Sequence, residues 1–157
     1  MILGIDPGLN GALSFYDGEE LIIHDMPTVE FQKNGKSRRK VDIHKLHRTM
    51  HDLMYPASHP NHIFIEQVSA QPSNGAAAAF SYGYGCGVVE ATVALLNLPY
   101  SYVSPQKWKK AMNCPKDKNA ARVRASQLLP KFSHNWDRKK DDGRAESALI
   151  ALYGYNQ

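Results

Sequence analysis

Residues 2–25 read ILGIDPGLNGALSFYDGEELIIHD, and this stretch decides the fold. Three apolar runs, at 2–5, 12–16 and 21–23, read as strands, with a turn rich in glycine between the first two. Asp17-Gly18 is a strong signal for a two-residue hairpin before the third run. The segment is therefore predicted to be a three-stranded antiparallel meander.

The rest of the chain alternates helices with single strands. Helical spacing of apolar residues predicts helices over 42–55, 75–97, 119–129 and 143–153, and one beginning near Pro105. Strands are expected at 62–66 and 100–103, a polar, basic loop around Asn34-Gly35 at 26–40, and irregular structure at 130–141. This order predicts one α/β domain over 1–157: a five-stranded mixed sheet, three antiparallel strands and then two parallel ones, flanked by helices.

Length and composition limit the class of protein. The chain has 157 residues, enough for one domain at roughly 100–200 residues each, and 43% hydrophobic with 22% charged residues excludes disorder and fibre. The longest apolar stretch, 88–98, is interrupted by Glu90 and is too short to span a bilayer. No secretory signal is visible, and two isolated cysteines, Cys86 and Cys114, fit a reducing compartment. We therefore expect a cytoplasmic protein.

The positive charge is concentrated in two segments. All 19 Lys and Arg lie in 33–48, with seven against one acid, and in 107–144, with twelve against four. Such clustering favours an extended polyanion, and the interleaved Phe31, Trp108 and Trp136 favour nucleic acid, although a solvated basic face and tryptophans that only pack would look similar. The residues expected to contact phosphates are Lys33, Lys36, Arg38, Arg39, Lys40, Lys107, Lys109, Lys110, Lys116, Lys118 and Arg122.

Two acids follow the two most apolar strands. Asp6 comes directly after the run at 2–5, and Glu66 ends the strand at 62–66. If the helical connection between them is right-handed, these strands are parallel neighbours and their carboxyl ends meet at one edge of the sheet. Asp6 and Glu66 would then lie within a few ångströms, and unpaired carboxylates that close resist ionising unless a cation lies between them.

The last helix supplies further acids. Asp142 and Glu146 are four residues apart and share a helical face, whereas Asp141 is five residues from Glu146 and is the weaker candidate. Oxygen ligands without His or Cys suit Mg²⁺ or Mn²⁺ rather than zinc. Four carboxylates can hold two ions about 3.5–4 Å apart, the arrangement that hydrolyses phosphodiesters. Together with the basic segments, this predicts a metal-dependent nuclease.

Four motifs run in order along the chain: GIDPG at 4–8, IEQV at 65–68, SPQKWKK at 104–110 and DGRAESAL at 142–149. Together they resemble the RuvC-type Holliday-junction resolvases, most closely the short phage-borne forms. The resemblance implies a ribonuclease H-like fold, a homodimer, and Mg²⁺-dependent paired incision of four-way DNA junctions in recombination and repair. It also implies a phage-infected bacterial cell or the bacterial nucleoid as the place of action.

The resemblance also assigns roles to single residues. Asp6, Glu66 and Glu146 match the family's catalytic, metal-binding acids. The bacterial family spaces its last two acids three apart, which here falls on a glycine, so Asp142 takes the fourth position with one extra residue. Lys109 and Lys118 are similar to lysines near the scissile phosphate, and of these Lys118 is the one expected in catalysis.

One family feature is missing. The bacterial pattern has an aromatic residue directly after Glu-Gln-Val, where this chain has Ser69, so any aromatic wedge into the junction would pass to Phe80 or Tyr82. The same helix, 75–97, carries a stripe of small side chains. The stripe would serve either packing on the protein's own sheet or a dimer interface; its members are Ala79, Gly83, Gly87 and Ala91.

Two other functions remain open from the sequence. One is a broader branched-DNA or RNA–DNA hybrid nuclease of the same fold, and the other is a junction-binding protein without catalysis. An actin-like sugar kinase or ATPase also opens on a Gly-Ile-Asp motif, but that fold needs two such domains and the 157 residues are too few.

Overall fold

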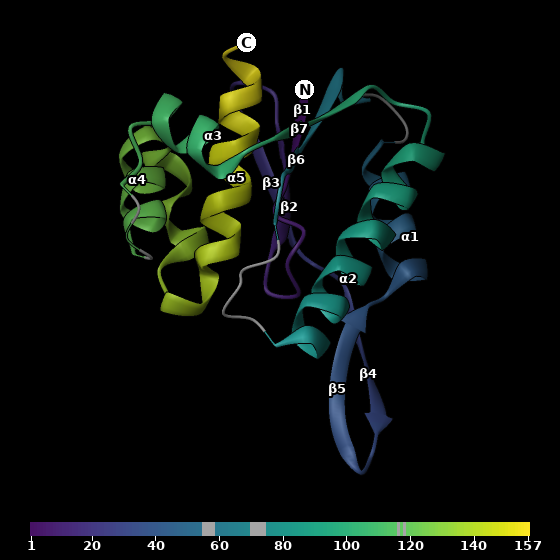
Figure 1. Ribbon diagram of the computed structural model, residues 1–157. Helices are drawn as coiled ribbons and strands as arrows, with labels where there is room; N and C mark the ends of the chain where they lie inside the picture. Colours follow the sequence, from purple (N-terminus) through teal and green to yellow (C-terminus); the bar gives the residue numbers. More distant parts are fainter. Residues whose placement is uncertain (55–58, 70–74, 116, 118) are drawn as a thin grey trace.

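The computed structural model describes residues 1–157 except 55–58, 70–74, 116 and 118 (Figure 1). The elements in chain order are β1 (Ile2–Ile5), β2 (Ala12–Tyr16), β3 (Leu21–Asp25), β4 (Thr28–Lys33), β5 (Lys36–Val41), α1 (Ile43–Met54), β6 (His62–Glu66), α2 (Ala76–Leu95), β7 (Tyr100–Val103), α3 (Pro105–Ala111), α4 (Ala120–Leu128), the 3₁₀ helices η1 (Pro130–Trp136) and η2 (Lys139–Asp141), and α5 (Asp142–Tyr155). No helix in the described part of the chain has the length and apolarity to cross a bilayer.

The central sheet has the strand order β3-β2-β1-β6-β7. The β1–β2 and β2–β3 pairs are antiparallel, and the β1–β6 and β6–β7 pairs are parallel. The helices α1 and α2 cover one face of the sheet, and α3, α4 and α5 cover the other (Figure 1). The predicted five-stranded mixed sheet, with three antiparallel strands followed by two parallel ones and helices on both faces, is therefore confirmed.

The helix α5 packs directly on β1 because glycine stands at the points of contact. A Cβ at Gly4 would collide with the backbone of Ser147 and Ala151, and one at Gly143 would collide with the backbone at Asn10. These contacts hold the first turns of α5 against the turn that follows β1. They also bring an acid of α5 to the edge of the sheet where Asp6 lies.

The structure corrects the prediction of a loop at 26–40. This segment forms the antiparallel hairpin β4–β5, whose turn places Asn34 at φ 52° and Gly35 at φ 70°. Positive φ at both central residues is what a tight, right-twisted hairpin turn requires, and Asn-Gly is the sequence that tolerates it. The polar composition of the strands concealed them, since almost all of their side chains are exposed.

Two other expectations also need correction. The hairpin at Asp17-Gly18 has four loop residues rather than two, because Tyr16 pairs with Leu21 and the Asp17 carboxylate accepts hydrogen bonds from the amides of Glu19 and Glu20. The segment 130–141, expected to be irregular, forms η1 and η2. Its aromatic residues Phe132 and Trp136 are buried, which gives a short basic segment an apolar anchor.

Candidate active site

Asp6 lies at the carboxyl end of β1, in a turn held by its own carboxylate. The amide of Gly8 donates to Oδ1 of Asp6 at 3.1 Å, and the amide of Asp6 donates to the carbonyl of Ala12 at 3.0 Å. The parallel register pairs Ile5 with Ile65, so the next residue of each strand is an acid, Asp6 or Glu66, at the same sheet edge. This register explains why Asp6 and Glu66 lie next to each other, as the sequence predicted.

Three acids from separate elements influence one another electrostatically. Burial, then the charge of Glu146, then the charge of Glu66 raise the pKa of Asp6 to about 7. Burial and the charge of Glu146 likewise raise the pKa of Glu66. Like charges that lie this close in a desolvated place disfavour ionisation, and a cation relieves the repulsion. β1, β6 and α5 each contribute one member of this carboxylate cluster (Asp6, Glu66 and Glu146).

Glu66 is held by a buried tryptophan. Its side chain is buried, and the indole N–H of Trp108 donates to Oε1 of Glu66 at 2.8 Å. This hydrogen bond opposes the effect of burial on the pKa of Glu66, because it favours the ionised carboxylate. Trp108 is itself fully buried, on α3, whose first turn is capped by the hydroxyl of Ser104. Burial leaves Trp108 as a packing residue and excludes the alternative that it stacks on DNA.

Glu146 is paired with Lys109. The Nζ atom of Lys109 lies 3.0 Å from Oε1 of Glu146 and 5.1 Å from the centre of the Trp108 ring. Burial disfavours the charged form of Lys109, but Glu146, with a contribution from Glu66, outweighs that effect and raises the pKa of the lysine. Lys109 therefore stands as a permanent cation beside the carboxylate cluster.

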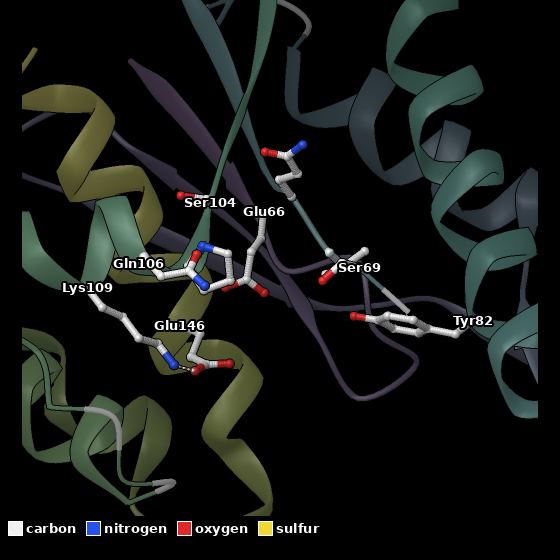
Figure 2. Close-up of a pocket in the computed structure, with 10 residues that line it drawn as sticks. Glu66, Ser69, Tyr82, Ser104, Gln106, Lys109 and Glu146 are labelled. Atoms are coloured by element: carbon white, nitrogen blue, oxygen red, sulfur yellow. Dashed lines mark hydrogen bonds and ion pairs between the residues drawn. The ribbon is translucent and has the colours of Figure 1, made fainter. Parts of the chain in front are cut away.

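An open pocket of about 650 Å³ adjoins these groups. Figure 2 shows the carboxylates of Glu66 and Glu146 and the hydroxyl of Tyr82 directed toward the same space from β6, α5 and α2. Sequence reasoning missed the polar lining between them, although the SPQKWKK motif marks part of it. The lining residues are Glu66, Gln67, Val68, Ser69, Tyr82, Ser104, Pro105, Gln106, Lys109 and Glu146.

The two remaining acidic candidates have other partners. Oδ1 of Asp142 accepts a hydrogen bond from Nε of Arg122 at 2.8 Å. Asp141 is 5% exposed and receives two hydrogen bonds from the guanidinium of Arg138, both at 2.9 Å. These bonds hold the pKa of Asp141 below its usual value, which marks a structural ion pair. The structure thus groups Asp6, Glu66 and Glu146, and directs the expected fourth acid, Asp142, to an arginine.

In the described part of the chain, no three His, Cys, Asp or Glu side chains lie close enough together to ligate one metal ion. The side chains of the carboxylate cluster instead have protein partners: Gly8 for Asp6, Trp108 for Glu66 and Lys109 for Glu146. Each of these carboxylates has one such partner, and the donor set is nonetheless all oxygen with a raised pKa at Asp6, which is the chemistry that Mg²⁺ and Mn²⁺ fit.

Comparison with solved structures identifies the fold. No protein-family model matches the sequence, and neither does any curated protein. The structure is similar to RuvC of Thermus thermophilus in complex with a Holliday junction substrate, with a TM-score of 0.62 and 15% identity over 97% of this chain and 90% of that one. The fold is that of RuvC. A second Thermus thermophilus RuvC structure gives a TM-score of 0.55 at 16% identity, again covering 97% and 90%.

The likeness extends to a eukaryotic protein. The yeast mitochondrial Holliday junction resolvase Ydc2 matches with a TM-score of 0.50 and 17% identity, over 98% of this chain and 76% of that chain. At identities this low, the structural likeness shows a shared RuvC-type fold and nothing finer. The resemblance to the short phage-borne forms stays a prediction.

The RuvC-type fold distributes the predicted DNA-contacting residues over two regions. Lys33, Lys36, Arg38, Arg39 and Lys40 lie on the β4–β5 hairpin, and Lys107, Lys109 and Lys110 lie on α3. Arg122 is bound to Asp142, to the carbonyl of Asp137 and to the side chain of Asn119, so its donors already have protein partners. Lys116 and Lys118, the latter the expected catalytic lysine, lie outside the described residues.

The helix α2 carries the small-residue stripe and both aromatic candidates for a wedge. A Cβ at Gly83 or Gly87 would meet no described atom within 4 Å, so these two positions of the stripe do not pack on the protein's own sheet. Of the two aromatic candidates on this helix, Phe80 is 77% exposed, whereas Tyr82 lines the pocket. The stripe is thus exposed at both glycines, and a dimer interface along it stays a prediction.

Proposed function

We propose that this protein is a structure-selective endonuclease that resolves four-way DNA junctions by paired, divalent-metal-dependent hydrolysis of phosphodiesters. The observation that carries the proposal is the carboxylate cluster of Asp6, Glu66 and Glu146, of which Glu66 and Glu146 line an open pocket together with Lys109. The RuvC-type fold, shared with a bacterial and a mitochondrial Holliday junction resolvase, supports the choice of substrate.

Asp6, Glu66 and Glu146 are the residues that would hold Mg²⁺, or Mn²⁺ in its place, with Asp142 as the proposed fourth ligand for a second ion. Bound ions would supply an activated water and a counter-charge for the leaving oxygen. Asp142 would have to exchange its partner Arg122 for this role. Asp141 is not proposed as a ligand, because its carboxylate already accepts two hydrogen bonds from the guanidinium of Arg138.

The chain's own groups have separate parts in the proposed reaction. Lys109 places a permanent positive charge beside the pocket, where a phosphate with its extra negative charge in the transition state gains from it. Trp108 fixes the direction of the Glu66 carboxylate. Lys118 is proposed as a second cation near the scissile phosphate on the strength of the resemblance to the RuvC-type resolvases alone.

We further propose a homodimer, because paired incision on opposite strands needs two active sites. The exposed outer face of α2 supports this proposal, since small residues allow a second backbone to approach closely. Exposed apolar side chains on the same helix, Phe80, Tyr84 and Leu95, would lose contact with water on association.

A substrate panel tests the function. Purified protein is incubated with a four-way junction, a flap, a fork, a linear duplex and an RNA–DNA hybrid, each with Mg²⁺, Mn²⁺ or EDTA. We expect the four-way junction to be cut in Mg²⁺ and in Mn²⁺, little cutting of the linear duplex, and no cutting in EDTA. A plasmid with an extruded cruciform adds a test of pairing, because paired incision linearises it and single incision nicks it.

Other outcomes of the substrate panel would favour the alternative functions. Equal cutting of the hybrid or of flaps would favour the broader nuclease of the same fold. Junction binding with no cutting in either metal would favour a junction-binding protein. Nicked plasmid alone would contradict paired incision by a dimer.

A further inference from the structure

The β4–β5 hairpin is an exposed two-stranded ribbon whose base contacts the turn that follows Asp6. Figure 1 shows it projecting beyond the helices, from the end of the sheet where β1 and β6 finish. At its base the guanidinium of Arg39 donates to Oδ1 of Asn10 at 2.7 Å, and Asn10 belongs to the turn that follows Asp6. The amide of Asp42 also donates to the carbonyl of Pro27, which closes the ribbon.

The register divides the ribbon's side chains between two faces. Cross-strand partners share a face, and successive pairs alternate between faces. The outer face, as we name it, therefore holds the pairs Val29–Lys40, Phe31–Arg38 and Lys33–Lys36. The inner face holds the pairs Thr28–Val41, Glu30–Arg39 and Gln32–Ser37.

Charge is segregated between these faces. The outer face carries four cations, Lys33, Lys36, Arg38 and Lys40, and residues 28–41, all of them described, place no acid on it. Its side chains are exposed, and Nζ of Lys40 lies 5.6 Å from the centre of the Phe31 ring. The cations of this face are thus available to a partner, with an aromatic ring among them.

The inner face makes the contacts with the protein itself, although Glu30, Gln32, Ser37 and Arg39 are exposed there as well. The hydroxyl of Ser37 donates to Glu30 at 3.1 Å, Val41 is buried, and Arg39 reaches Asn10. The single acid and the single arginine of this face balance each other in charge. Arg39, expected from the sequence to contact DNA, thus anchors the ribbon to the turn of Asp6.

We propose that the outer face of the ribbon binds the phosphate backbone of a duplex DNA arm adjacent to the cleavage site. This proposal rests on the proposed function, which makes DNA the partner. Charge complementarity supports it, because a row of cations with no acid matches a row of phosphates. The dimensions also fit, since a two-stranded ribbon is narrow enough to lie along or within a DNA groove.

Two double variants with the same change in net charge test the face assignment. Lys33→Gln with Lys36→Gln removes two charges from the outer face, and Gln32→Glu with Ser37→Glu adds two negative charges on the inner face at the adjacent cross-strand pair. Fluorescence anisotropy with a four-way junction and with a linear duplex, over a salt series, measures affinity for each protein. Circular dichroism and thermal unfolding verify that both variants fold.

The outer-face variant is expected to bind both DNAs more weakly, with the slope of log affinity against log salt shallower by about 2, because about 0.9 of a counterion is released per phosphate contact. The inner-face variant is expected to keep the wild-type slope. Equal weakening by both variants, or an unchanged slope in the outer-face variant, would overturn the proposal while leaving junction cleavage by the wild type intact. If the wild-type protein binds neither DNA, both the proposed function and the proposal for the outer face are wrong.

Discussion

Replacing Asp6 by Asn is expected to lower the rate of junction cleavage by roughly 10³-fold or more while junction binding is retained. The substitution keeps the size of the side chain and an oxygen that can accept the hydrogen bond from the Gly8 amide, so the turn is preserved. It removes a carboxylate whose pKa both Glu146 and Glu66 raise. Single-turnover cleavage of a labelled junction and a gel-shift assay, both in Mg²⁺, measure the two effects separately.

A matched control variant distinguishes the loss of a carboxylate in the cluster from the loss of a carboxylate in any turn. Asp17 also follows a strand and also accepts amide hydrogen bonds in its own turn, but it is exposed and lies at the end of β2. Asp17→Asn is expected to cut at the wild-type rate. Since Asp6→Asn removes a charge that burial and two like charges disfavour, its melting temperature in EDTA should not fall. Cleavage at the wild-type rate by the Asp6 variant would refute the site.

Replacing Trp108 by Phe is expected to raise the Mg²⁺ concentration needed for half-maximal cleavage by about 10- to 100-fold. The substitution leaves an aromatic ring in the core but removes the N–H that donates to Glu66. Groups that orient a metal's ligands affect metal affinity or activity by that factor, although they touch neither metal nor substrate. Cleavage measured over a Mg²⁺ titration, with melting temperature recorded in parallel, tests this positioning role.

The chain contains its own control for the loss of a buried indole. Trp136 is also buried in the same core, and its indole N–H donates to the hydroxyl of Ser126 at 2.9 Å, an acceptor that lies outside the pocket lining. Trp136→Phe is expected to cost a similar amount of stability and to leave the Mg²⁺ dependence unchanged. If both variants shift the Mg²⁺ dependence equally, the effect of Trp108 comes from general loosening of the core.

Local patterns predicted most of the fold. The apolar runs and the helical spacing located the five strands of the sheet, and the right-handed crossover rule placed β6 beside β1. The hairpin β4–β5 was missed because its strands are exposed on almost every residue and carry no apolar alternation strong enough to outweigh the polar composition. The Asn34-Gly35 turn was the signal that could have found it.

In the candidate site, the positions of the acids could be predicted from the sequence, whereas their hydrogen-bond partners could not. Asp6 and Glu66 could be paired from strand ends, and Glu146 from the inward face of the last helix. The partners of these acids could not be predicted, because Trp108 is 42 residues from Glu66 and Lys109 is 37 residues from Glu146. No periodicity links such positions. The same is true of Asp142, whose pairing with Arg122 depends on how α4 lies against α5.

Crystals grown with Mn²⁺ test the central claim most directly, because anomalous scattering locates the ion without reference to activity. We predict an anomalous peak bounded by oxygens of Asp6, Glu66 and Glu146, with Lys109 displaced from Glu146, and no such peak in crystals of the Asp6→Asn variant. Crystals of the wild type at an Mn²⁺ concentration that supports cleavage, with these three carboxylates free of any peak, would contradict the account.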